Sequence, residues 1–315
     1  MAIAGEGRFD IHYHIVMPGS ALSRVAGGPA EWTPERAVEE LDRNGIATGF
    51  CSAASGWGEV DAATARASAR AWNDYAAKLA RDYPGRFGLL AALPLPAIEA
   101  SLEEIAYAFD VLKADGLGIQ TSYGDRWLGD PHFTPLYEEL ERRKAVVYVH
   151  PTDAPCSTGL SYMKAPVFGS WIEWPMNSAR TMFSLLLNEI PRRFSGIRFI
   201  FAHDGGTMPL LVGRIQGMAQ NARPEFPAKV RATFPDGVEA EYRKFYFDTA
   251  QGYAPVNFEA MRRLVPESHI LFGSDYPFFP IRAAVDGLTK LNLPPALLRA
   301  IERGNAEALL RKPQV

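Results

Sequence analysis

The sequence predicts a (β/α)8 barrel, an α/β fold in which eight parallel strands alternate with helices around one closed sheet. Short, almost continuously apolar runs recur along the chain, and segments with helical periodicity separate them. Such runs are typical of parallel strands that are buried on both faces. No glycine-rich phosphate loop follows the first run, which disfavours the alternative, a doubly wound open sheet. We therefore expect a single barrel domain over residues 1–315.

Eight runs carry the strand pattern, and the spacing between them leaves room for a helix after each. The predicted strands are 8–16, 46–52, 86–93, 116–121, 145–150, 197–203, 244–249 and 270–275.

The first helix has clear end signals. Thr33 is a good N-cap, Pro34 suits the first helical position, and Asn44-Gly45 suits the C-terminal end. The other predicted helices are 60–82, 97–114, 133–143, 175–190, 208–220, 256–264 and 281–291, with a last segment, 295–310, packed on the outside.

Two long connections are predicted insertions on the C-terminal face of the barrel, where active sites form. Residues 17–32 follow the first strand and are rich in Gly, Ala and Pro. Residues 152–174 follow the fifth strand and contain Trp171 and Trp174, which argue against a merely disordered insertion. Long loops at this face are usually lids or substrate walls. A third connection, 221–243, precedes the seventh strand and is polar.

Composition excludes several classes of function. The chain is 47% hydrophobic and 22% charged, with a net charge of -3, so a nucleic-acid or anionic-membrane partner is not expected. No apolar run reaches the roughly 18 residues that a membrane span needs. The first residues lack the features of a signal peptide. Cys51 and Cys156 fit no metal or redox spacing, which predicts free thiols in a reducing, cytoplasmic compartment.

The first strand carries the strongest chemical signal. His12 and His14 are one residue apart, so their side chains point to the same side of the strand. A single histidine there would usually be a structural group. Two on one face suggest a site for a divalent metal ion, which needs further ligands from other strands.

Further ligands stand where other predicted strands end. His150 ends the fifth strand, His203 the sixth and Asp275 the eighth, so topology brings them to the rim that carries His12 and His14. His12, His14, His150 and Asp275 would hold one divalent ion, and His203 would act as acid or base beside it.

The fourth strand ends without lysine, so a carbamylated lysine bridging two metals is not supported. His132 and His269 lie outside the strand ends and are interpreted as surface or capping residues.

At this point the chain resembles the amidohydrolase superfamily, and within it the amidohydrolase-related, ACMSD-like branch of metal-dependent decarboxylases and hydrolases. The resemblance covers nearly the whole chain, and its motifs occur in order. They are Asp10-x-His12-x-His14, Val149-His150-Pro151, Ala202-His203-x-Gly205-Gly206 followed by Pro209 and Gly213-Arg214-Ile215, Leu271-Phe272-Gly273-Ser274-Asp275-Tyr276-Pro277, and Asn305-Ala306 with Leu309.

The resemblance implies roles for these residues. The metal ligands would be His12, His14, His150 and Asp275, with His203 and Asp275 catalytic. Zn²⁺ would be the usual ion, with Mn²⁺ as the alternative. The resemblance also implies a homo-oligomer, either a homodimer or a tetramer.

Three further residues are implied in substrate binding. Arg214 matches an arginine that reaches into the neighbouring subunit's site in the family's semialdehyde decarboxylase, although an ordinary surface arginine is the alternative. Trp171 and Trp174 correspond loosely to a loop that covers the pocket. Arg24 is only a candidate for a second arginine that this decarboxylase carries after the first strand.

Three functions remain open from the sequence. The first is a non-oxidative carboxy-lyase, in which a small aromatic or enoic carboxylic acid binds the ion and loses CO2. The second is a hydrolase of a lactone, ester or amide that uses the same ion and the same acid and base groups. The third is a metal-binding barrel without catalysis, which would need a closed coordination sphere.

Overall fold

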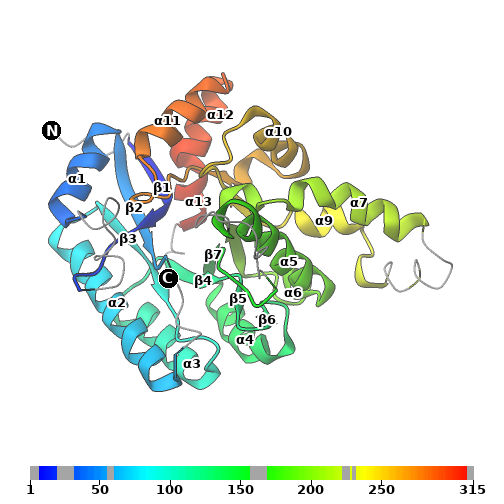
Figure 1. Ribbon diagram of the computed structural model, residues 1–315, viewed down its shortest axis with the longest axis horizontal. Helices are drawn as coiled ribbons and strands as arrows, with labels where there is room; N and C mark the ends of the chain where they lie inside the picture. Colours follow the sequence, from blue (N-terminus) through cyan, green and yellow to red (C-terminus); the bar gives the residue numbers. More distant parts are fainter. Residues whose placement is uncertain are drawn as a thin grey trace, which may run out of the picture.

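The predicted barrel is confirmed by a computed structural model, which describes residues 7–19, 32–54, 60–156, 169–221, 228 and 232–310. Eight parallel strands form one sheet in the order β1-β2-β3-β4-β7-β8-β9-β10, with helices around it (Figure 1). The strands are β1 (Arg8–His14), β2 (Ile46–Ser52), β3 (Phe87–Ala92), β4 (Gly116–Gln120), β7 (Val146–His150), β8 (Arg198–Phe201), β9 (Tyr246–Asp248) and β10 (Ile270–Leu271).

The sheet closes where the chain following β10 meets β1. The amide of Ile11 donates to the carbonyl of Phe272 at 3.0 Å, and the amide of Asp275 donates to the carbonyl of His12 at 2.8 Å. The closing bonds therefore place the predicted ligand Asp275 directly beside the predicted ligand His12.

Most strands are slightly shorter than predicted, and two of them, β8 and β10, end before the predicted site residues. β8 ends at Phe201, and His203 lies in a 3-10 turn, while β10 ends at Leu271, four positions before Asp275. The reason is the backbone: His203 has φ 56° and Asp275 has φ 65°, which no strand accommodates. Both residues stand on turns just past the strand ends, so the predicted convergence at the rim is preserved.

The first strand contains a bulge that the sequence pattern does not predict. Asp10 pairs with Gly49, but Tyr13 pairs with Cys51, so three steps along β1 match two along β2. Ile11 consequently packs with the residues that fill the lower barrel, and Tyr13 packs with the layer between sheet and helices. The extra residue lets His12, next to Ile11, also contribute to the barrel's interior.

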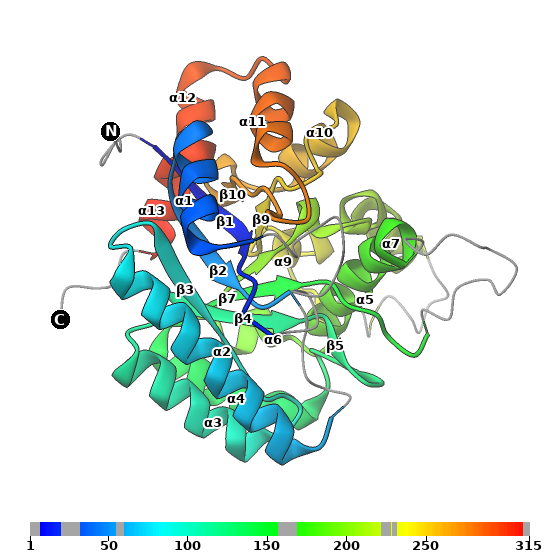
Figure 2. The ribbon, with the colours of Figure 1, turned by 60° about the vertical axis from the view of Figure 1, so that its left-hand side comes forward.

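The helices surround the sheet, and Figure 2 shows α2, α3 and α4 on one side and α10, α11 and α12 on another. The α-helices are α1 (Pro34–Arg43), α2 (Ala62–Asp82), α3 (Ile98–Ala106), α4 (Thr134–Arg143), α5 (Trp174–Leu187), α6 (Ile190–Arg193), α7 (Met208–Asn221), α9 (Val238–Tyr242), α10 (Pro255–Leu264), α11 (Ile281–Lys290), α12 (Pro295–Arg299) and α13 (Asn305–Leu310). Among the described residues, no helix is long and apolar enough to cross a bilayer.

Several local predictions need correction. The expected polar connection 221–243 contains α9, because Val238, Glu241 and Tyr242 are buried against the barrel. The expected insertion 152–174 ends in a π-helical turn, Gly169–Glu173, that runs into α5. A small antiparallel hairpin, β5 (Ser122–Tyr123) with β6 (Arg126–Trp127), follows β4. Most of the predicted insertion 17–32 lies outside the described residues.

Asn73 ties α2 to the end of β3. Its amide donates to the carbonyl of Ala92 (2.9 Å) and to Glu104 (2.7 Å), and its carbonyl accepts from the amide of Ala92 (2.8 Å). Because the site is buried, Asn73→Ala would leave these groups unpaired, and we expect the free energy of unfolding in denaturant to fall by about 2–4 kcal/mol. The control Asn188→Ala removes an exposed helix-end bond to Ser184 and should cost less than about 1 kcal/mol. Equal losses in the two variants would contradict the assignment.

Candidate active site

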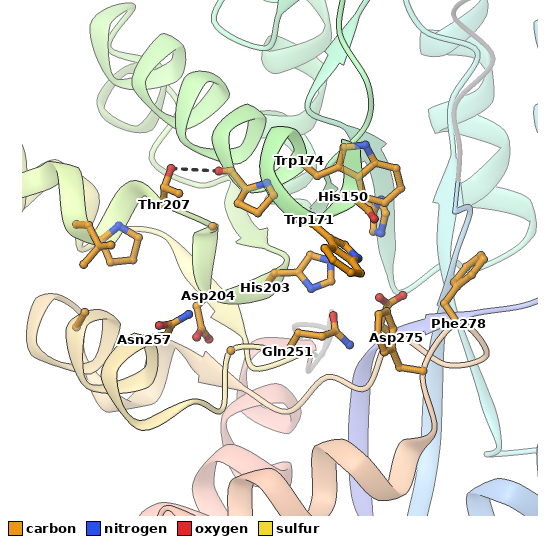
Figure 3. Close-up of a pocket in the computed structure, with 18 of the residues that line it drawn as sticks. His150, Trp171, Trp174, His203, Asp204, Thr207, Gln251, Asn257, Asp275 and Phe278 are labelled. Carbon is orange, nitrogen blue, oxygen red and sulfur yellow. Dashed lines mark hydrogen bonds between the residues drawn. The ribbon is translucent and has the colours of Figure 1, made fainter. Parts of the chain in front are cut away.

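A cavity of about 610 Å³ opens at the C-terminal ends of the strands, and Figure 3 shows its interior. His150, His203 and Asp275 lie in its lining. Much of the remaining wall is aromatic or apolar: Ala54, Trp171, Trp174, Pro175, Pro209, Leu210, Ala260, Phe278 and Phe279. The cavity is therefore a largely apolar chamber with its ionisable groups concentrated near the strand ends, as small-molecule sites commonly are.

The four predicted metal ligands come together. His12, His14, His150 and Asp275 are all buried, and one ligand atom from each lies within 4.8 Å of the others. Oδ1 of Asp275 is 3.3 Å from Nε2 of His12 and 3.3 Å from Nε2 of His14. Within the described part of the chain, neither of these nitrogens has a hydrogen-bond partner. Buried imidazole nitrogens that have no hydrogen-bond partner are available to coordinate an ion, as expected of a metal site.

The rings are oriented by their other nitrogens. Nδ1 of His14 lies 3.0 Å from the carbonyl oxygen of Ser52, and Nδ1 of His150 lies 2.7 Å from that of Pro151. Since a carbonyl only accepts, each Nδ1 carries the proton and each Nε2 keeps its lone pair for an ion. This set of three nitrogens and one oxygen fits a single divalent cation.

The electrostatics of the cluster favour positive charge at its centre. Burial opposes a charge on His12, but the carboxylates of Asp248 and Asp275 outweigh it and raise the pKa of His12 to about 10. Burial likewise opposes a charge on Asp275, yet His12 and His14 hold its pKa well below the usual range. A field that stabilises a proton on His12 would also stabilise a metal cation bound there.

His203 stands beside the cluster without belonging to the ligand set. Its ring centroid is 4.6 Å from that of His12 and 5.9 Å from that of His150. Nδ1 lies 3.0 Å from the carbonyl oxygen of Ala250, which fixes the proton on Nδ1. Burial and the charge on His12 lower the pKa of His203. His203 is therefore a neutral, oriented imidazole next to the ligands, suited to moving a proton.

Asp248 is a site residue that the sequence analysis placed in a strand but did not assign. One oxygen, Oδ2, lies 3.1 Å from Nδ1 of His12 and accepts from the hydroxyl of Tyr148 at 2.9 Å. The other, Oδ1, accepts from the amides of His203 (3.1 Å) and Ala250 (2.9 Å). Burial opposes its charge, but His12 lowers its pKa below the ordinary value. Its position at the end of a strand was a usable signal.

Asp10 joins the two ends of the closed sheet. Oδ1 accepts from the amides of His12 (3.2 Å) and Ser274 (3.0 Å), and Oδ2 accepts from the hydroxyl of Ser274 at 2.5 Å. Burial raises the pKa of Asp10 to about 7. The first acid of the Asp10-x-His12-x-His14 motif thus holds the chain beside two metal ligands rather than adding a ligand.

Asp204 was also unassigned by the sequence analysis. Its side chain lines the cavity, is 3% exposed, and has no hydrogen-bond partner for either oxygen among the described residues. Burial and the neighbouring carboxylate of Asp248 raise the pKa of Asp204 well above its usual range. A buried polar group left unpaired costs about 1–3 kcal/mol.

The predicted tryptophans and arginine differ in their placement. Trp174 lies in the cavity wall, where its Nε1 donates to Oδ1 of Asp153 at 2.8 Å and its ring centroid is 5.8 Å from that of His150. Trp171 also lines the cavity but is 69% exposed. Arg214 is exposed on α7 and is not among the lining residues of its own chain. The candidate Arg24 lies outside the described residues.

A closed (β/α)8 barrel with three histidines and one aspartate gathered at its C-terminal rim defines the class of TIM-barrel proteins with a metal-binding site at that rim. The chain belongs to the amidohydrolase family, whose sequence model matches residues 9–312.

Similar proteins share a reaction class. The chain is 34% identical to 6-methylsalicylic acid decarboxylase of Penicillium expansum over 95% of this chain and 94% of that protein. It is 34% identical to decarboxylase yanB of Aspergillus niger over 87% of this chain and 78% of that protein. These relatives confirm the predicted decarboxylase over the hydrolase and the non-catalytic barrel.

Solved structures show the same fold. The structure of 2,6-dihydroxybenzoate decarboxylase from Rhizobium superposes with a TM-score of 0.85 at 22% identity, covering 97% of this chain and 98% of that one. Dihydroxybenzoic acid decarboxylase from Polaromonas, with bound manganese and the inhibitor 2-nitroresorcinol, gives a TM-score of 0.84 at 21% identity, covering 97% of each chain.

Asp248→Asn tests whether the carboxylate supports the metal ligands. The amide keeps an acceptor oxygen but loses the charge beside His12, so we expect metal affinity to fall about 10- to 100-fold with the fold retained. Metal content per chain after dialysis against a chelator, measured by mass spectrometry, is the readout. Asp110→Asn, which alters only a surface ion pair with Arg143, is the matched control. Equal metal retention by both variants would exclude this role.

Proposed function

We propose that the protein is a metal-dependent, non-oxidative decarboxylase of a hydroxybenzoic acid that carries one carboxylate. The observation that carries this proposal is the three-histidine, one-aspartate set beside the neutral imidazole of His203, at the inner end of an aromatic cavity. The apolar wall suits a flat ring, and the name of the 34% identical 6-methylsalicylic acid decarboxylase supports an aromatic acid over the enoic alternative.

The charge of the lining limits the substrate. Among the described residues that line the cavity, no lysine or arginine is present. A carboxylate buried without a cation is strongly disfavoured, so within one chain only the metal-ligand end of the cavity accommodates one. This supports a monocarboxylate.

We further propose that His12, His14, His150 and Asp275 hold one divalent ion, Zn²⁺ in the first instance and Mn²⁺ as the alternative. When bound, the ion would supply Lewis-acid polarisation of the substrate's oxygen atoms. The imidazole-rich set supports zinc, while the manganese in the Polaromonas structure supports the alternative.

The residues of the chain carry out the rest of the reaction. Trp174 and Phe278 flank the ring and exclude water, and Trp171 covers the mouth of the cavity. Without substrate His203 is neutral and Asp275 is ionised, so the acid must first take up a proton, which a negatively charged substrate beside it favours by raising its pKa. His203 or Asp275 then delivers this proton to the ring carbon that bears the carboxylate. The bond from that carbon to the carboxylate then breaks, its electron pair returns to the ring, and CO2 leaves. The products are the phenol and CO2, so one proton is consumed.

Asp275→Asn is the central test of this chemistry. Asparagine cannot deliver the proton and is a weaker ligand, so we expect a correctly folded barrel whose CO2 release from hydroxybenzoates falls by about a thousandfold or more. His203→Asn, compared in parallel, separates the two candidate acids, because the ligand set stays complete in that variant. Full activity of Asp275→Asn would exclude Asp275 as the acid, and full activity of both variants would end the acid proposal. Acid release from lactones without CO2 from hydroxybenzoates in the wild type would replace the decarboxylase with a hydrolase.

We also propose that the chain acts as a homo-oligomer, with the homodimer as its smallest form. Apolar side chains are exposed at Trp171 (69%) and Leu210 (69%), which line the cavity, and at Met218 (56%), which shares α7 with Leu210 and Arg214. Exposed apolar groups of this kind favour a contact between copies. In such a contact Arg214 would reach the neighbouring cavity.

Two further predictions, on cellular location and on domain organisation, complete the proposal. Cys51 and Cys156 are both unpaired, which supports a reducing, cytoplasmic location. The match of the family model to residues 9–312 supports a single domain over residues 1–315.

Mixing two impaired variants at a substrate concentration well below KM tests whether Arg214 acts across subunits. Arg214→Ala should raise the KM for hydroxybenzoates, and Asp275→Asn should abolish turnover. After equal mixing and subunit exchange, activity should recover to about one quarter of the wild-type value, because half of the dimers are mixed and each holds one complete site. Light scattering gives the oligomeric state in the same samples. Mixed dimers without recovered activity would place Arg214 outside the site.

A further inference from the structure

The carboxyl group of Asp204 lies at the end of the cavity remote from the metal ligands. Figure 3 shows it on the far side of His203 from Asp275, with Asn257 next to it in the view. Both residues line the cavity. Asp204 belongs to neither the ligand set nor the hydrogen bonds that orient His203, so the proposed chemistry leaves it without a role.

The chain makes special provision for this carboxyl. Asp204 has φ 56° and ψ 16°, a left-handed conformation that glycine or asparagine adopts more readily. Gly252 opposes it: a Cβ atom there would lie 1.9 Å from Oδ2 of Asp204. Two neighbouring segments are thus arranged to seat a carboxyl group whose oxygens bond to no other described residue. An unpaired buried group of this kind calls for an explanation, and a ligand is one.

The surroundings fit a neutral hydrogen-bonding partner rather than an ion. The described lining residues include no lysine or arginine, and Asp248 lies close enough to disfavour a second negative charge. A carboxylic acid in its neutral form both donates and accepts a hydrogen bond. A phenolic hydroxyl offers the same two functions, whereas a methyl group or a second carboxylate does not.

We propose that Asp204 is a specificity-determining residue that hydrogen-bonds a second hydroxyl group, carried by the substrate on the ring edge remote from its carboxylate. The carboxyl rests against Gly252 with both oxygens buried, so meeting that hydroxyl requires the Asp204 side chain to turn toward the cavity. Asn257, which is exposed at the same end, offers a further polar contact. The inference rests on the proposed function, because it takes the carboxylate to lie among His12, His14, His150 and Asp275. It narrows the substrate class to dihydroxybenzoic acids.

The hydroxyl preference of the holoenzyme tests the proposal. The ligands are 2-hydroxybenzoate and its 2,3-, 2,4- and 2,5-dihydroxy counterparts, and both kcat/KM for CO2 release and Kd by calorimetry are measured. We expect at least one dihydroxybenzoate to exceed 2-hydroxybenzoate about tenfold, the gain of one well-placed hydrogen bond in a buried site. No preference for any added hydroxyl would overturn the proposal.

Two substitutions then assign the preference to Asp204. Asp204→Gly removes the carboxyl and suits the left-handed backbone, so the preference should fall to about twofold or less. Asp204→Asn keeps a donor and an acceptor and should retain most of it. Asp286→Asn, at an exposed ion pair with Arg282, is the matched control and should leave the preference unchanged. A full preference in Asp204→Gly would overturn the proposal.

A structural role for the carboxyl makes a different prediction. The hydroxyl of Tyr242 is also buried without a partner, and the charge of Asp204 acts on it, so an internal water could join the two groups. In that case Asp204→Gly would lower the denaturant midpoint of unfolding and leave the preference intact. The specificity role predicts a midpoint that is unchanged or higher.

The calorimetric Kd values separate a failure of the proposed decarboxylase function from a failure of the proposed role of Asp204. If no hydroxybenzoate releases CO2, the proposed function fails. The ratio of the Kd values, in wild type and in Asp204→Gly, would still decide whether Asp204 recognises an added hydroxyl.

Discussion

The buried carboxylate of Asp248 holds the parts of this site in place. It lies against the ring of His12 and accepts hydrogen bonds from the hydroxyl of Tyr148, two strands away on β7, and from the backbone amides of His203 and Ala250. The carbonyl of Ala250 in turn contacts Nδ1 of His203. The carboxylate of Asp248 therefore fixes the positions of both the ligand His12 and the neighbouring imidazole of His203. In a buried site such shared bonds fix geometry better than separate contacts would.

The cavity above this anion is divided by function. Its inner end gathers charge: four ligands whose mutual field favours a cation. Its walls are aromatic and apolar, and these exclude water from the ring and strengthen the electrostatic interactions at the inner end. The far end of the cavity is again polar, because Asp204 and Asn257 line it. A flat substrate with polar groups on two opposite edges matches this order.

Much of the site can be predicted from the sequence because its residues occupy the same kind of position, the end of a predicted strand. His12, His14, His150, His203 and Asp275 all stand at or just beyond the ends of apolar runs, and parallel topology brings such positions to one rim. The eight runs were recognised because burial on both faces leaves them almost without polar residues. Asp248 follows the same rule, and counting every ionisable strand-end residue would have included it.

Other features depend on tertiary structure and leave little trace in local pattern. The left-handed backbone at His203, Asp204 and Asp275 cuts β8 and β10 short, although the apolar runs continue toward those residues. The π-helical turn before α5 and the isolated carboxyl of Asp204 arise from contacts between distant segments. Periodicity and propensity are properties of neighbours along the chain, so they do not report such contacts.

The bulge in β1 has a consequence for how this barrel can vary. Below it, Phe9 and Ile11 pack with the lower layer of side chains, and above it His12 and His14 aim at the rim. Because of the extra residue, the side chains of the two halves of the strand alternate between the faces of the sheet independently of each other. Substitutions that change the volume of the lower-layer residues are therefore expected to leave the orientation of His12 and His14 unchanged. The lower layer of the barrel can then vary in sequence while the metal-binding residues keep their geometry.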